Sequence, residues 1–84
     1  MSALQPGVYR HFKGGLYRLL GQARHSETQE SMVVYQALYG ERGWWVRPAS
    51  MWTETVEREG KVVQRFTYIA PDEASARAAL DANE

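Results

Sequence analysis

The segment from residue 33 to residue 48 constrains the fold most, because it has the pattern of two strands joined by a short polar loop. It contains two adjacent tryptophans, Trp44 and Trp45, followed closely by Arg47. Adjacent residues on a strand point to opposite faces of a sheet, so the two indoles cannot share one face. One indole is therefore expected in the core and the other at the surface, where an indole beside an arginine is a candidate binding platform.

The length and composition of the chain limit the classes of function that it can have. The chain has 84 residues and no cysteine, which predicts one small domain without a disulfide or a thiolate site. Ten basic and ten acidic residues give a net charge of zero, so the overall basic excess of a general nucleic-acid binder is missing. No apolar segment approaches the ~20 residues of a membrane span, and the N-terminus lacks the pattern of a signal peptide. We therefore expect a cytoplasmic protein with no membrane association.

Short strands separated by polar turns are expected along most of the chain. The predicted strands cover residues 8–12, 16–24, 32–39, 44–47, 53–57 and 62–69. Gly14 and Gly15 suit a two-residue hairpin turn, which would place Phe12 opposite Tyr17. Residues 49–52 form a short link of at most one helical turn. This arrangement predicts a mainly β fold, a small antiparallel barrel of about five strands.

The character of the chain changes after Pro71. Residues 72–82 have high helix propensity and begin with acidic residues, which favour the N-terminus of a helix. The apolar stripe of this segment consists of alanines and Leu80, and a helix of this length is marginal on its own. The sequence thus predicts a barrel domain over residues 7–69 and an Ala-rich tail, helical or frayed, over residues 70–84.

Several motifs in register resemble a known small bacterial family. They are residues 9–14 (YRHFKG), 25–28 (HSET), 33–39 (VVYQALY) and 45–48 (WVRP). These motifs are similar to those of domain-of-unknown-function family 1653, over roughly residues 7 to 69. The resemblance implies an SH3-like barrel and no established activity. The chain has Trp44 where this family usually has an aliphatic residue, Trp52 where it usually has phenylalanine, and Gln64 in place of a proline.

A register for the central hairpin follows from treating residues 40–43 as its loop. This register pairs Tyr39 with Trp44 and Gln36 with Arg47. The more apolar face then holds Trp44, which is assigned to the core in agreement with the aliphatic residue of the resembling family. The full predicted core is Tyr17, Leu19, Tyr35, Tyr39, Trp44, Val46 and Phe66.

The opposite face of this hairpin carries the main candidate site. It presents Gln36, Trp45 and Arg47, where the indole offers a flat surface for a base, a proline or a sugar ring. The arginine offers a planar fork for phosphate or carboxylate. The alternative is a cation–π pair that seals the barrel, or an indole covered by the C-terminal tail.

Other polar residues are weaker candidates for ligand contact. His25 and Glu27 lie in a polar loop, and Arg10 belongs to a possible strip of strand arginines. Neighbouring His, Ser and Glu residues do not by themselves provide the alignment that a nucleophile and its base require, so a local turn role is favoured. No metal site or cofactor is expected, because at least three convergent ligands are needed.

Three functions from different classes remain open. The first is a binding module without catalytic activity, centred on Trp45 and Arg47, with a protein partner or single-stranded nucleic acid as its ligand. The second is a structural protein in which the same aromatics form a homo-oligomeric interface. The third is a small enzyme that uses His25 or His11. A monomer or a weak homodimer is expected.

Overall fold

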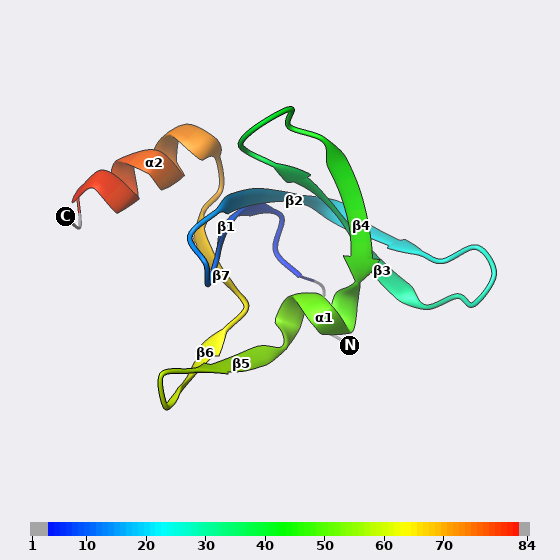
Figure 1. The fold of residues 1–84 in the computed structure, drawn as a ribbon. Helices are drawn as coiled ribbons and strands as arrows, with labels where there is room; N and C mark the ends of the chain where they lie inside the picture. Colours follow the sequence, from blue (N-terminus) through cyan, green and yellow to red (C-terminus); the bar gives the residue numbers. More distant parts are fainter. Residues whose placement is uncertain (1–3, 83–84) are drawn as a thin grey trace.

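The computed structural model describes residues 4–82, which form a mainly β fold with seven strands and two helices (Figure 1). The strands are β1 (Gly7–His11), β2 (Leu16–Arg24), β3 (Ser31–Ala37), β4 (Trp44–Pro48), β5 (Thr55–Arg58), β6 (Lys61–Gln64) and β7 (Phe66–Ala70). The helices are α1 (Ala49–Thr53) and α2 (Glu73–Ala82). The predicted mainly β architecture with a C-terminal helix is therefore confirmed.

Five strands form one antiparallel sheet in the order β4-β3-β2-β1-β7, and β5 and β6 form a separate hairpin. Within residues 4–82 no backbone ladder joins the edge strands β4 and β7, so the expected barrel is not closed by hydrogen bonds. The sheet curves, and α1 lies at its lower end while the β5–β6 hairpin projects away from it (Figure 1). The predicted last strand is split at Arg65 into β6 and β7.

One face of the sheet packs on a cluster rich in aromatic rings, here called the main cluster. Its buried members are Tyr9, Leu19, Val33, Tyr35, Trp52 and Phe66. Helix α1 supplies Trp52, whose ring stacks on Phe66 with centroids 3.8 Å apart and an angle of 3°. Trp52 is 1 % exposed, so the short link after β4 contributes the largest core side chain.

Helix α2 packs on the other face of the sheet, over β7 and β1. Here the buried residues of the second cluster are Val8, Leu16, Leu38, Ala70 and Ala76. Ala76 comes from α2 and is fully buried, while Leu80 packs against the edge of the cluster. Asp72 caps this helix by accepting a hydrogen bond from the Ser75 amide at 2.8 Å.

The register of the first hairpin differs from the prediction. Tyr9 lies opposite Tyr17, whereas the two-glycine turn would have placed Phe12 there. The turn is longer because the His11 amide donates to the Gly15 carbonyl at 2.8 Å, which leaves residues 12–14 outside the ladder. Gly14 has a φ of 109°, which glycine adopts readily, so its place in the turn agrees with the sequence.

The register of the central hairpin also differs, by three residues. Trp44 pairs with Gln36 and Trp45 with Tyr35, because residues 38–43 lie outside the strands. Leu38 leaves the β3–β4 ladder because its side chain is buried in the second cluster and its amide donates to the Leu16 carbonyl at 3.0 Å. An odd shift exchanges the two faces of a strand.

This exchange corrects the predicted core. Leu19, Tyr35 and Phe66 are buried as expected, and Tyr17 packs partly buried against the main cluster. The prediction is wrong for three residues, which are largely exposed: Tyr39, Trp44 and Val46. Sequence reasoning missed several of the most deeply buried residues, which are Val8, Val33, Leu38 and Trp52.

Candidate functional site

Both tryptophans of β4 are exposed, on opposite faces of the sheet. Trp45 is 60 % exposed and Trp44 is 68 % exposed, since β4 is an edge strand. Cross-strand partners share a face, so Trp45 lies on the side of its buried partner Tyr35 and Trp44 lies on the side of Gln36. The expectation of an exposed Trp45 agrees with the structure, whereas the expected burial of Trp44 is wrong.

Gln36 and Arg47 do not share a surface. Arg47 pairs with Val33 and lies on the face of Trp45, whereas Gln36 is on the opposite face. The Gln36 side-chain amide donates to the Arg42 carbonyl at 3.1 Å, which gives it a role in the β3–β4 loop. The predicted pairing of Gln36 with Arg47 is therefore wrong, and Trp45 and Arg47 remain as neighbours on one strand face.

Arg47 is half-buried against aromatic rings. Its guanidinium carbon lies 5.6 Å from the ring centre of Tyr35 and 5.3 Å from that of Phe66. Its Nε atom is buried and has no hydrogen-bond partner among the described residues. This is the cation–π contact that the sequence offered as an alternative, although its rings belong to the main cluster and not to Trp45.

The remaining predicted residues lie away from Trp45. His25 and Glu27 are at the tip of the β2–β3 hairpin, where the Glu27 amide donates to His25 Nδ1 at 3.1 Å. Arg10 is exposed on β1, beside a separate hollow that His11 and Phe12 also line. The structure thus does not bring His25, Glu27 or Arg10 together with Trp45 and Arg47.

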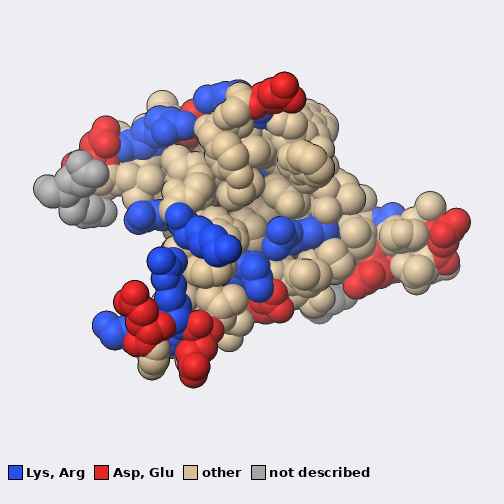
Figure 2. Space-filling view, in the orientation of Figure 1, with Lys and Arg blue, Asp and Glu red and all other residues tan. Residues whose placement is uncertain are grey.

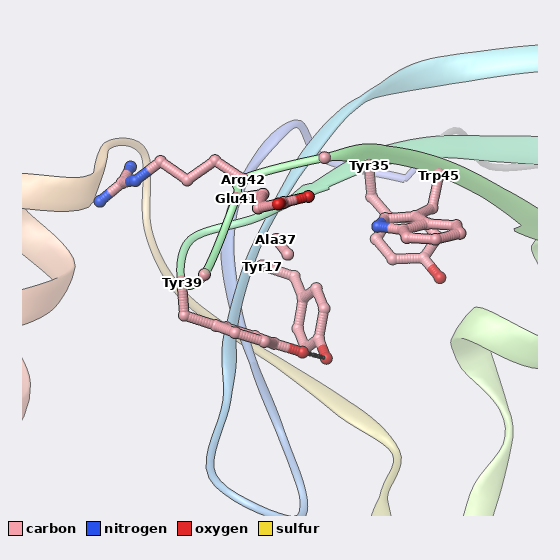
Figure 3. Close-up of a pocket in the computed structure, with 9 residues that line it drawn as sticks. Tyr17, Tyr35, Ala37, Tyr39, Glu41, Arg42 and Trp45 are labelled. Carbon is pink, nitrogen blue, oxygen red and sulfur yellow. Dashed lines mark hydrogen bonds between the residues drawn. The ribbon is translucent and has the colours of Figure 1, made fainter.

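Trp45 forms part of the wall of a pocket of about 380 Å³, here called the aromatic pocket (Figure 3). The lining residues are Tyr17, Tyr35, Ala37, Tyr39, Gly40, Glu41, Arg42, Gly43 and Trp45. The Tyr17 ring stands at 81° to that of Tyr39 and at 68° to that of Tyr35, with centroids 5.4 and 5.7 Å apart. Strands β2, β3 and β4 and the β3–β4 loop therefore supply four aromatic side chains around one hollow.

Two tyrosines of this pocket hold each other in place through their hydroxyl groups. The hydroxyls of Tyr17 and Tyr39 share a hydrogen bond, drawn as a dashed line in Figure 3. Burial, and then this hydrogen bond, raise the pKa of Tyr17 to about 12. Gly15 lies behind both rings, because a Cβ atom there would be 3.2 Å from Tyr39 and 3.3 Å from Tyr17.

The charged groups of the pocket are Glu41 and Arg42, and they are not equivalent. Arg42 extends away from the hollow, whereas the Glu41 carboxylate lies between the loop and Trp45 (Figure 3). The Arg42 guanidinium donates to both carboxylate oxygens of Glu73 in α2, at 2.9 and 3.0 Å. Among the described residues, Glu41 takes part in none of the ion pairs.

A second group of charges lies near the main cluster, here called the cationic corner. Three cations approach the Phe12 ring within 5.8 Å: Lys13, Arg58 and Arg65. Burial, then Arg65, Arg47 and Lys13 in that order, hold the pKa of His11 below its ordinary value. Figure 2 shows basic side chains gathered across the middle of this face, beside the β5–β6 hairpin.

The histidines of the described residues take part in turns and belong to no metal-binding group. Residues 4–82 contain no group of three or more His, Asp or Glu side chains arranged to hold a metal ion. The Nδ1 atoms of His11 and His25 both accept backbone amide hydrogens in turns, from Lys13 at 3.2 Å and from Glu27 at 3.1 Å. In the same part of the chain, no helix has the length and apolar character required to cross a membrane.

Sequence reasoning found Trp45 but missed the rest of its pocket. The sequence pattern places Tyr39 in the core and Glu41 in a hairpin loop. The sequence feature that points to this pocket is the set of aromatic residues on β2 and β3 next to a glycine-rich loop. This feature alone does not predict the pocket, because the aromatic side chains come together only in the observed register.

The comparisons with known proteins place the chain in a family. The family model described as protein of unknown function (DUF1653) matches residues 7–68. A crystal structure of a DUF1653 protein from Bordetella bronchiseptica has 43% sequence identity and a TM-score of 0.74, covering 80% of this chain and 88% of that one. No curated protein matches the chain significantly. The chain therefore belongs to DUF1653, a family of unknown function, as the sequence motifs indicated.

Proposed function

We propose that this protein is a binding module without catalytic activity, and that its ligand enters the aromatic pocket beside Trp45. The observation that carries this proposal is an indole 60 % exposed that nonetheless forms a wall of a hollow of about 380 Å³. Ligand sites are concave, mostly apolar and equipped with a few polar groups, and this hollow has all three properties. We expect the module to act in the bacterial cytoplasm, since it needs no oxidising compartment.

Trp45 is not the indole that fills the core of this fold. Trp52 fills the main cluster, so the fold already has a buried indole at its centre. Large exposed aromatics are enriched at interfaces, where they provide contact area with little loss of conformational entropy. Arg47 lies two residues along the same strand face, with its guanidinium group against the Tyr35 ring.

Single-stranded nucleic acid is a second candidate ligand, supported by the cationic corner. Aromatic platforms beside basic side chains are the usual means of binding single strands, by base stacking and phosphate neutralisation. Two observations argue against a nucleic acid. Arg65 is already paired with Glu54 at 2.7 Å, and the charged group facing the aromatic pocket is an acid.

The homo-oligomeric alternative is tested by sedimentation at several concentrations.

The test is a set of amide-resolved NMR titrations of the full chain with four probes. Uridine monophosphate, proline amide, N-acetylglucosamine and choline represent the base, proline, sugar and ammonium groups that an indole accepts. At least one probe is expected to shift the amides of Gly43 and Trp45. Trp45→Ala should remove this shift, whereas Trp44→Ala, the adjacent and equally exposed indole on the other face, should retain it. If none of the four probes shifts these amides, the proposal is wrong.

A further inference from the structure

We propose that the aromatic pocket selects a positively charged, alkylated ammonium group. This inference rests on the proposed function, and it names the chemistry of the ligand. Two sources carry such a group: a free quaternary amine, and an alkylated lysine side chain in a protein. The structure supports the shared chemistry through ring geometry, charge and the small number of side-chain hydrogen-bond acceptors.

The rings are arranged to surround a compact group and not to sandwich a flat one. Tyr17 stands nearly perpendicular to both Tyr39 and Tyr35, at 81° and 68°. Trp45 lies across the β3–β4 ladder from Tyr35 and forms a further wall. Aromatic faces attract a cation held within ~6 Å of the ring centre, and several faces around one hollow add their attraction. A planar base stacks best on one open ring or between two parallel rings.

The charge around the pocket also favours a cation. Glu41 contributes a carboxylate at the mouth of the hollow, on the side of Trp45 (Figure 3). The neighbouring Arg42 is drawn away by its two hydrogen bonds to Glu73, at 2.9 and 3.0 Å, so its charge is neutralised outside the pocket. This leaves Glu41 as the lining charge that is not held in an ion pair with a described residue, while the Arg47 guanidinium lies outside the lining, against the Tyr35 ring.

Alkylation follows from the small number of side-chain acceptors. A bare ammonium brings three N–H donors, each of which loses water on entry and needs a partner. The side-chain acceptors that line the hollow are the Glu41 carboxylate and the tyrosine hydroxyls, and those of Tyr17 and Tyr39 are engaged with each other. An ammonium whose hydrogens are replaced by methyl groups has nothing to satisfy, and its methyl groups fit the apolar walls.

The experiment compares choline with its uncharged carbon isostere, 3,3-dimethylbutan-1-ol, in titrations of the full chain followed by tryptophan fluorescence and amide NMR. Choline is expected to bind more tightly by about 2- to 30-fold, the range that cation–π attraction provides. Trp45→Ala and Tyr39→Ala should each abolish the selectivity, whereas Trp44→Ala should keep it. Both Trp45 and Tyr39 are more than half exposed, and thermal unfolding of each variant verifies that it is folded.

Glu41→Gln supplies the electrostatic control, because an exposed loop glutamate can be neutralised without touching the core. It should weaken choline binding by about threefold or more and leave the isostere unaffected. A trimethyllysine peptide, its unmodified lysine counterpart and free choline then distinguish the two sources. Equal affinity for choline and the isostere would overturn the inference. If uridine monophosphate or proline amide binds at Trp45 while choline does not, the binding module stands and its ligand is not an ammonium group.

Discussion

At the scale of single residues, the three tryptophans occupy three different environments. Trp52 is buried in the main cluster and stacked on Phe66, whereas Trp44 and Trp45 project from opposite faces of an edge strand. Trp52→Ala should cost about 3–5 kcal/mol of the free energy of unfolding, because it leaves a large cavity. Trp44→Ala and Trp45→Ala should each cost less than about 1 kcal/mol. Chemical denaturation of the three variants measures this contrast.

The contrast separates the observed register from the one expected from the sequence. In the expected register Trp44 is a core residue, and its truncation would be as costly as that of Trp52. A large loss of stability in Trp44→Ala alone would therefore contradict the observed pairing of Trp44 with Gln36.

Gly7 is the glycine whose replacement should cost most. Its φ is +146°, and a Cβ atom would lie 2.9 Å from both the Ala70 carbonyl oxygen and the Tyr68 ring. Gly7→Ala should lower the free energy of unfolding by more than about 1 kcal/mol, through backbone strain and steric contact. Gly21→Ala is the matched control, since it lies in a strand with open space around its Cβ position and should be neutral or stabilising. Equal effects in the two variants would contradict the close approach of β1 and β7 at Gly7.

At the scale of elements, the Glu73 carboxylate links α2 to the β3–β4 loop through Arg42. Hydrogen bonds from Arg42 and then Arg77 lower the pKa of Glu73 from its usual 4.5 to about 2. A lowered pKa means that the folded state favours the ionised carboxylate. Its stabilising contribution is therefore complete above pH 4.5 and is lost as the pH falls toward 2.

Hydrogen exchange of the α2 amides should accordingly rise as the pH drops through this window, after correction for the intrinsic rate. Glu73→Gln should show the faster exchange already at pH 6 and a smaller further change down to pH 2. Some dependence should remain, because the hydrogen bond from Ser75 also lowers the pKa of Asp72, the helix cap. An unchanged pH profile in Glu73→Gln would mean that the contact with Arg42 does not hold the helix.

The positions of the strands could be predicted from the sequence, whereas their registers could not. Alternation of apolar and polar residues located β2 over residues 16–24 and placed the other strands of the main sheet within a few residues. It could not predict the registers, because each depends on where a loop begins. The β3–β4 loop begins early because Leu38 is bound to β2 and buried against α2, a contact between segments far apart in sequence. The position of Leu38 therefore decides which face of β4 carries Trp45, and with it which residues surround this indole.

At the scale of the whole molecule, a net charge of zero conceals an uneven surface. Basic side chains gather at the cationic corner, whereas the aromatic pocket has an acid at its mouth (Figures 2 and 3). The two regions therefore predict responses to salt of very different size. A single-stranded nucleic acid would release counterions as it binds, with the logarithm of the affinity falling by about 0.7 per contacted phosphate for each tenfold rise in salt.

An ammonium group that binds in the aromatic pocket releases almost no counterions, because its attraction comes mainly from ring faces and from one carboxylate. Choline affinity should change by less than about threefold between roughly 0.05 and 0.5 M sodium chloride, the part due to Glu41 being the only one that salt screens strongly. Isothermal titration at both ionic strengths measures this, with a uridine decanucleotide as the comparison ligand. In Glu41→Gln even the small dependence on salt should disappear. A steep loss of choline affinity that persists in Glu41→Gln would show that the cation is held by charges elsewhere on the surface, outside the ring of tyrosines around Trp45.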